Sequence, residues 1–153
     1  MRSYAAVAAV AVSAALAPPA HAVRPGTFSG TLKSPVTGET APMGFKVDRK
    51  GRVTAFRFSD VKLTCSDGDT VAAPKVVTPK GVTFPVRGNR FGIEARNDET
   101  GFGWDADGAF RSKGRRSTGT FRAFARFDER NQQDPDGEIR CVSASFSWNA
   151  RRR

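Results

Sequence analysis

Two carboxylates beside a tryptophan are the residues of this chain whose types and spacing come closest to a reactive site. Asp105 and Asp107 directly follow Trp104, and Glu94 or Glu138 would supply a further acidic partner. Glycoside hydrolysis needs only an acid and a base, or an acid and a nucleophile, at a fixed separation. An Asp-Ala-Asp-Gly run is also ordinary turn chemistry, because aspartate binds its own backbone and glycine accepts positive φ. We therefore expect Asp105–Gly108 to form a turn without a catalytic role. The alternative function is that of a carboxylate-dependent enzyme, such as a glycosidase acting on extracellular polysaccharide.

Histidine chemistry is excluded once the N-terminal segment is removed. The only histidine, His21, falls within residues 1–22, which have the organisation of a secretory signal peptide. The segment contains a positive start at Arg2, the apolar run Ala5–Ala17 and the small-x-small cleavage site Ala20–Ala22. Cleavage leaves residues 23–153 without imidazole, so Ser-His-Asp and Cys-His mechanisms and histidine-containing zinc sites are not available. We predict a non-enzyme with no metal and no cofactor.

The remaining chain has the size of one secreted domain. Residues 23–153 suit a single unit able to bury a core. The apolar run is shorter than the roughly 18 residues of a membrane span, so we expect no transmembrane segment in the mature chain. In the oxidising environment that an exported protein meets, Cys65 and Cys141 are most simply a disulfide. Closing so long a loop is worth about 4 kcal/mol in the chain-entropy model. The two cysteines are far too distant in sequence for a C-x-x-C redox pair.

The chain is strongly basic. Its formal net charge is +10, and residues 23–153 carry +9 because Arg2 is the only charged residue before them. For an exported protein the attracted partners are anionic envelope polymers, lipid headgroups or acidic polysaccharide, and not nucleic acid. Six cations would form a polyanion patch if the loop before one long strand folds over its polar face: Arg111, Lys113, Arg115, Arg116, Arg122 and Arg126. A solvated face with a frayed basic tail at Arg151–Arg153 is the plain alternative.

Apolar residues at every second position run through most of the chain and predict strands. The predicted strands are Met43–Val47, Val53–Phe58, Val61–Cys65, Val82–Val86, Phe91–Ala95, Phe102–Trp104, Ala109–Ser112, Phe121–Phe127 and Val142–Asn149. No stretch has a sustained 3.6-residue period with caps, so we expect little helix. Short turns without crossover helices imply an all-β fold, an antiparallel β-sandwich or barrel of about 8–10 strands. The phenylalanines then fill the core.

The cysteines do not fit this alternation in the same way. Cys141 falls on the serine face of the last predicted strand, whereas Cys65 falls with the apolar Val61 and Leu63. A bulge, a strand end or a bond between sheet faces would reconcile them. The sequence leaves all three open.

Aspartates also recur two positions apart, as calcium ligands often do. The runs are Asp67-Gly68-Asp69, Asp105-Ala106-Asp107 and Asp134-Pro135-Asp136, the last within a polar loop from Asp128 to Glu138. None completes the twelve-residue calcium-loop pattern. We expect turns and solvated loops at these positions.

Trp104 is the candidate platform for a carbohydrate ligand, with Asp105 and Asp107 beside it. It lies between Gly101-Phe102-Gly103 and an Asp-rich run, a placement that suits an exposed loop better than that of Trp148 on its alternating strand. Packing in the core is the expected alternative. The sole tyrosine leaves with the signal peptide, which removes a residue that commonly stacks on sugars.

The order of several short motifs resembles that of a group of small secreted all-β proteins of uncharacterised function from actinobacteria-like, high-GC bacteria. The matching motifs are Gly26-Thr27-Phe28-Ser29-Gly30, Phe45-Lys46-Val47 with Gly51-Arg52-Val53, Leu63-Thr64-Cys65, Gly119-Thr120-Phe121, and Cys141 followed by Ser147-Trp148-Asn149-Ala150. The resemblance spans nearly all of residues 23–153. It implies export, a β fold and a bond between the two cysteines, and it carries over no catalytic residue. The sequence therefore predicts a non-catalytic extracellular or envelope-associated binding module.

Overall fold

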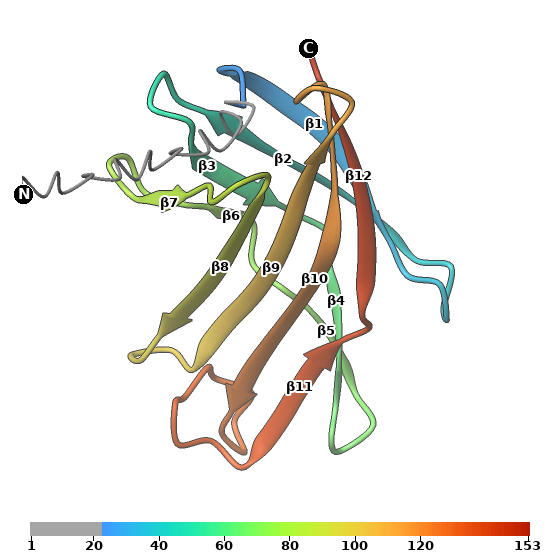
Figure 1. The fold of residues 1–153 in the computed structure, drawn as a ribbon. Coiled ribbons are helices and arrows are strands. Elements are labelled where there is room, and N and C mark those ends of the chain that lie inside the picture. Colours follow the sequence, from blue (N-terminus) through green and yellow to red (C-terminus); the bar gives the residue numbers. More distant parts are fainter. Residues whose placement is uncertain (1–22) are drawn as a thin grey trace, which may run out of the picture.

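The computed structural model describes residues 23–153, and the predicted signal peptide, with His21, lies outside the described residues. Within 23–153 the chain forms a sheet of twelve strands and no helix, which confirms the all-β prediction (Figure 1). The strands are β1 (Gly26–Lys33), β2 (Thr40–Val47), β3 (Arg52–Phe58), β4 (Lys62–Cys65), β5 (Thr70–Ala72), β6 (Val76–Val77), β7 (Thr83–Pro85), β8 (Arg90–Asn97), β9 (Phe102–Arg111), β10 (Arg116–Phe127), β11 (Ile139–Ser143) and β12 (Phe146–Arg152). This part of the chain contains no helix capable of crossing a membrane.

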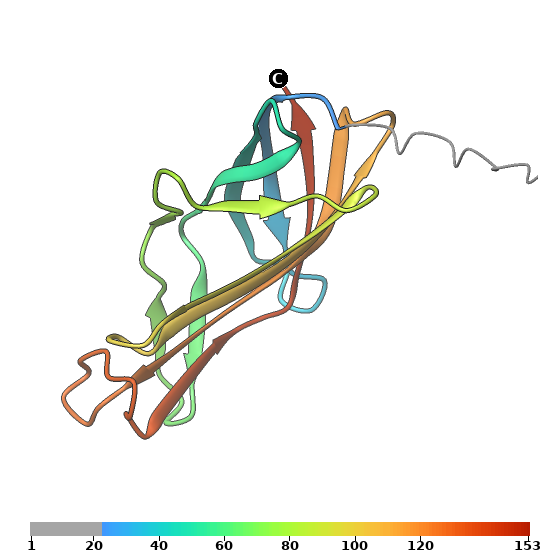
Figure 2. The ribbon, with the colours of Figure 1, turned by 60° about the vertical axis from the view of Figure 1, so that its left-hand side comes forward.

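The longest strand, β10, organises the sheet. One of its edges pairs with β9, while the other pairs first with β12 and then with β11. The main path runs β5-β4-β11-β10-β12-β1-β2-β3-β6, with β7 paired to β3 and β8 paired to β9. All pairs are antiparallel, and the sheet curls into a half-barrel (Figures 1 and 2). The curl gives the sheet an inner face, which holds the core, and an outer face open to solvent.

Aromatic rings fill the inside of the half-barrel. Phe28, Phe45, Phe56 and Trp104 stack in a column with centroid separations of 4.8, 6.1 and 5.0 Å and interplanar angles of 7°, 8° and 16°. All four side chains are buried. The column joins the wall of β1, β2 and β3 to the wall formed by β9. Each such pair adds about 0.5–1.5 kcal/mol beyond the burial of its surface.

Two glycines make room for the second tryptophan. Gly108 on β9 and Gly119 on β10 are directly opposite each other and face inward. A Cβ on Gly108 would lie 2.8 Å from Trp148 Cζ2, and a Cβ on Gly119 would lie 2.5 Å from Trp148 Cε2. The indole therefore lies over bare backbone, and its Nε1 donates a hydrogen bond to the carbonyl oxygen of Thr120 at 3.3 Å. A side chain at Gly108 would also collide with the Phe91 ring, and one at Gly119 would also collide with the backbone carbonyl oxygen of Asp107.

A β-bulge lets three residues of β3 face the core. Strict alternation would place Val53 on one face and Phe56 and Phe58 on the other. The register between β2 and β3 shifts opposite Phe45, and Ala55 adopts φ 47° there. The extra residue reverses the alternation, so Val53, Phe56 and Phe58 are all buried.

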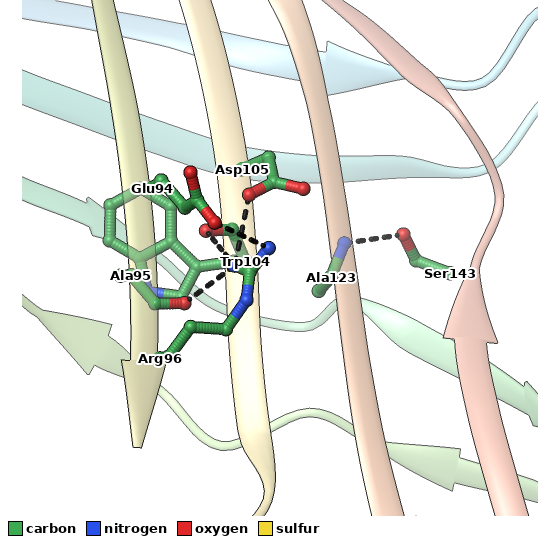
Figure 3. A network of polar contacts seen from close by, with 7 residues as sticks. All are labelled: Glu94, Ala95, Arg96, Trp104, Asp105, Ala123 and Ser143. Atoms are coloured by element: carbon green, nitrogen blue, oxygen red, sulfur yellow. Dashed lines mark hydrogen bonds and ion pairs between the residues drawn. The ribbon is translucent and has the colours of Figure 1, made fainter. Parts of the chain in front are cut away.

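A break between β11 and β12 resolves the conflict between the two cysteines. The prediction of one continuous strand from Val142 to Asn149 was wrong, because Ala144 and Ser145 lie between two strands. The break reverses the alternation in the same way as a bulge. Cys141 and Ser143 therefore face the core, and so do Phe146 and Trp148 beyond it. Ser143 Oγ accepts a hydrogen bond from the backbone N–H of Ala123 at 2.9 Å, which occupies a donor where the pairing partner of β10 changes (Figure 3).

The predicted disulfide is confirmed. Cys65 on β4 and Cys141 on β11 are directly opposite each other, with Cα atoms 3.9 Å apart, and they are bonded. Among residues 23–153 no free cysteine remains. The bond fixes the β4–β5 hairpin to the end of the sheet that carries the β10–β11 loop.

Candidate functional site

Trp104 and the two neighbouring aspartates face opposite sides of the sheet. The predicted turn at Asp105–Gly108 was wrong, because β9 is continuous through it and pairs with β8 and β10 along its two edges. Strand alternation then points Trp104 into the core, where its side chain is 3% exposed, and directs Asp105 and Asp107 outward. The three side chains do not line one surface. Trp104 is a packing residue of the aromatic column.

Arg96 holds the carboxylates nearest to Trp104. Its Nη1 lies 2.9 Å from Asp105 Oδ1, and its Nη2 lies 3.2 Å from Glu94 Oε1 (Figure 3). The same guanidinium covers the Phe124 ring at 4.2 Å from the centroid. Both carboxylates of this pair therefore accept from one cation, in an arrangement typical of a surface ion-pair network. Glu138 lies outside this network, at the end of the β10–β11 loop.

The other two Asp-rich runs, Asp67–Asp69 and Asp134–Asp136, form turns. Asp67 Oδ1 accepts from the backbone N–H of Asp69, and Asp134 Oδ1 accepts from that of Asp136, at 3.0 and 2.9 Å. Asp128 Oδ1 accepts from the backbone of both Arg130 and Gln132. In the described part of the chain, no three acidic, cysteine or histidine residues are grouped so as to hold a metal ion. The carboxylates stabilise loop backbone, as expected of aspartate in turns.

Three arginines lie side by side on the outer face of the sheet. Arg111 on β9 is directly opposite Arg116 on β10, and Arg116 is directly opposite Arg151 on β12. We call these three residues the arginine row. Adjacent strands are about 4.8 Å apart, so the row spans roughly 10 Å. All three residues are exposed, and every ion pair within residues 23–153 belongs to Arg52 or Arg96.

The structure brings together four of the six cations predicted to form a patch and separates the other two. Lys113 and Arg115 lie in the tight β9–β10 turn beside the arginine row, which already contains Arg111 and Arg116. Ser112, Lys113 and Gly114 all have positive φ there, so the loop forms a compact turn and does not fold over the strand. Arg122 lies six residues further along β10, about 20 Å away. Arg126 is at the far end of β10, where its Nη1 donates to the carbonyl oxygen of Pro135 at 3.4 Å.

A groove beside the arginine row contains two further arginines that were not predicted as site residues. This first groove has a volume of about 690 Å³ and lies between the β7–β8 turn and the outer face of β8, β9 and β10. Its cations are Arg87 and Arg90, at the two ends of the β7–β8 turn, together with Arg111. Thr118 and Thr120 contribute hydroxyl groups, and Asp107 is its one acidic side chain. Arginine forks and hydroxyl donors together suit an oxyanion.

Arg151 was assigned to a frayed tail by its position in the sequence. The tail instead belongs to β12, which pairs with β1 on one edge and β10 on the other. The backbone N–H of Arg152 donates to Arg115 O, and that of Arg153 donates to Thr27 O, each at 2.9 Å. The run of three arginines was the available signal, but only the pairing partners of β12 show that it continues a row.

The connecting segments at the two ends of the half-barrel carry opposite charges. Figure 1 shows the β2–β3 turn, the β9–β10 turn and the C-terminus at one end, and the β4–β5, β8–β9 and β10–β11 connections at the other. The segments of the first end, which we call the basic end, are 23–26, 48–52, 87–90, 111–116 and 151–153, and Asp48 is their only acidic residue. The segments of the second, acidic end are 66–69, 98–101 and 128–138, and Arg130 is their only cation.

Comparison with protein families and with curated proteins assigns no function to this chain. No family model matches this chain, and no curated protein matches it.

Proposed function

We propose that this protein is a secreted, non-catalytic binding module that holds anionic polymers of the cell envelope or acidic extracellular polysaccharide against its basic end. The observation that carries the proposal is the arginine row, in which Arg111, Arg116 and Arg151 are adjacent without an acidic partner. Like charges directly opposite each other on paired strands are unfavourable. A polyanion lying across the strands would relieve this repulsion.

The residue types support an oxyanion partner. Guanidinium groups present a rigid fork of donors that matches carboxylate, phosphate and sulfate oxygens, and they are charged at every physiological pH. The row contains only arginine, and the adjoining first groove adds Arg87 and Arg90. The acidic end would face away from a negatively charged polymer, so the separation of charge favours one orientation of the bound protein.

Two features support an extracytoplasmic location. The bond between Cys65 and Cys141 is of the kind that persists in oxidising compartments. Residues 1–22 have the parts of a signal peptide. Secretion would bring the basic end into contact with envelope polymers and polysaccharide.

The test is the salt dependence of polymer binding. The protein with residues 23–153 is titrated with dextran sulfate at several salt concentrations, with neutral dextran as the uncharged control. Each lost cation-to-polymer contact should lower the slope of log K against log salt by about one. We expect Arg116→Gln and Arg151→Gln each to lower the slope in this way and to weaken binding about fivefold at 0.1 M salt.

The matched control is Arg130→Gln, which removes one positive charge from the acidic end. Its slope and affinity should remain close to those of the unaltered protein. Equal binding of neutral dextran, a flat salt response, or equal effects of all three substitutions would contradict the proposal.

A further inference from the structure

A second groove lies on the outer face of β1, β2 and β3. Its volume is about 350 Å³, and its cations are Arg57 from β3, Lys75 from the segment before β6, and Arg153 at the end of the chain. Ser29 also lines it and carries a hydroxyl donor, whereas the hydroxyl of Ser59, beside the same groove, donates to Asp60 Oδ2 at 2.7 Å. No acidic side chain lines this groove, in contrast to the first groove. Three cations from three separate segments thus face one hollow.

A glycine positions the central cation of this second groove. Gly44 on β2 is directly opposite Arg57 on β3, and a Cβ there would lie 2.9 Å from Arg57 Nη2. The guanidinium therefore lies over bare β2 backbone and is partly buried. No carboxylate within residues 23–153 pairs with it. A partly buried cation without a counter-ion is favoured when an anion from outside supplies the charge.

The second groove continues the arginine row. Arg151 is directly opposite Ser29, Ser29 is directly opposite Gly44, and Gly44 is directly opposite Arg57. Arg57 therefore lies in the same transverse line of the sheet as the arginine row. The distance from Arg111 to Ser29 is three strand spacings, or about 15 Å. Arg116 and Arg151 occupy the strands between, so cations continue from one groove to the other.

We infer that the second groove is an anion subsite for a phosphate or sulfate ester group carried by the polymer. The inference rests on the proposed function and adds the chemical class of the ligand. A tetrahedral ester offers three terminal oxygens, whereas a carboxylate offers two oxygens and one charge. Arg57, Lys75 and the Ser29 hydroxyl are all donors, so they match the group with more acceptor oxygens. A polymer with repeated ester groups reaches both grooves at once.

The experiment compares three polymers and four variants. The polymers are dextran phosphate, dextran sulfate and polygalacturonate, which carry phosphate monoester, sulfate ester and carboxylate groups. The variants are Arg57→Gln and Lys75→Gln in the second groove, Arg116→Gln in the arginine row, and Arg130→Gln as the charge-matched control. Affinity is measured at several salt concentrations, and thermal melting confirms that each variant is folded. Lys75 is exposed, so its substitution keeps the test open if Arg57→Gln fails to fold.

We expect dextran phosphate or dextran sulfate, or both, to bind more tightly than polygalacturonate of matched length and charge density. Arg57→Gln and Lys75→Gln should each weaken binding of the ester polymers about fivefold at 0.1 M salt and lower the salt slope by about one. The effect on polygalacturonate should be smaller. Tighter binding of only one ester polymer identifies phosphate or sulfate as the group that is held.

Two outcomes would overturn the inference. If Arg57→Gln and Lys75→Gln match the control while Arg116→Gln weakens binding, the second groove is not a subsite, although the proposed function stands. If polygalacturonate binds as tightly as both ester polymers and loses as much affinity in the groove variants, the ligand class is wrong. Failure of the unaltered protein to bind any of the three polymers would remove the proposed function as well.

Discussion

Replacement of Trp104 tests whether this residue packs in the core or binds ligand. Its side chain is 3% exposed and stacks on Phe56 at 5.0 Å, with Phe58 against its edge at 5.5 Å. Removal of a fully packed large aromatic side chain costs about 3–5 kcal/mol, because contacts are lost and a cavity remains. Trp104→Ala should therefore lower the free energy of unfolding by about that amount. For a domain of this size the melting temperature should fall by roughly 10–20 °C.

The assay is urea denaturation followed by far-ultraviolet circular dichroism, with thermal melting beside it. Trp104→Phe keeps a ring in the column and should lose less than half as much stability as Trp104→Ala. Val142→Ala, at a side chain that is 46% exposed, should change the free energy of unfolding by less than about 0.5 kcal/mol. Under conditions where Trp104→Ala remains folded, polymer binding should be unchanged. A loss below about 1 kcal/mol in Trp104→Ala, or loss of polymer binding by its folded form, would refute the assignment of this ring to the core.

Three further outcomes follow from local geometry. Gly119→Ala should lower the free energy of unfolding by about 1–3 kcal/mol, measured by urea denaturation, because its Cβ would collide with the backbone carbonyl oxygen of Asp107 and would lie 2.5 Å from Trp148 Cε2. Ala55→Gly should leave stability unchanged or raise it by up to about 1 kcal/mol, because Ala55 has φ 47°, and a clear loss would argue against the bulge. The pKa of Asp48 is held below its usual 3.8, mainly by the hydrogen bond from the backbone N–H of Arg52 and further by that residue's guanidinium. Asp48 should therefore stabilise the β2–β3 turn above pH 3.8, and this stabilisation should be lost as the pH falls through the lowered pKa. The loss should be seen as faster amide hydrogen exchange in this turn, after correction for the intrinsic exchange rate. Equal amide exchange of this turn in Asp48→Asn and in the unaltered protein at neutral pH would contradict the prediction.

Local pattern was enough to predict the fold class and several hairpins. The alternation on either side of Asp48–Gly51 predicted β2 and β3, and the alternation from Phe121 to Phe127 predicted most of β10. Alternation of apolar and polar residues is a property of neighbours in sequence, so it predicts a strand even when the strands that pair with it are unknown. The disulfide was predictable because the chain contains only two cysteines.

The errors came from places where long-range pairing overrides local preference. Asp105–Gly108 has the composition of a turn, but β8 and β10 pair with both edges of that segment and extend it. Ala55 and the break at Ala144–Ser145 each reverse which residues face the core, and a pattern of period two contains no marker for such a reversal. The sequence therefore predicted the positions of the strands more reliably than it predicted which residues of each strand face the core.

The candidate site could be predicted only in part, because it also depends on long-range strand pairing. Arg111 and Arg116 are close in sequence and joined by one hairpin, so their proximity was predictable. Arg151 joins them only because β12 pairs with β10, and Arg57 joins the same line through β1 and β2. Such transverse rows combine residues from distant parts of the chain, and sequence separation gives no measure of their distance.

The most direct test of the account is a map of where a polyanion touches the protein. Nuclear magnetic resonance spectra of ¹⁵N-labelled protein would be recorded during titration with a short dextran sulfate, with neutral dextran as the control. The account predicts that the largest shifts fall on the arginine row, Arg111, Arg116 and Arg151, and on the two adjoining grooves. Shifts centred on the acidic loop 128–138, or no shifts at saturating polymer, would contradict the claim that the basic end is the binding surface.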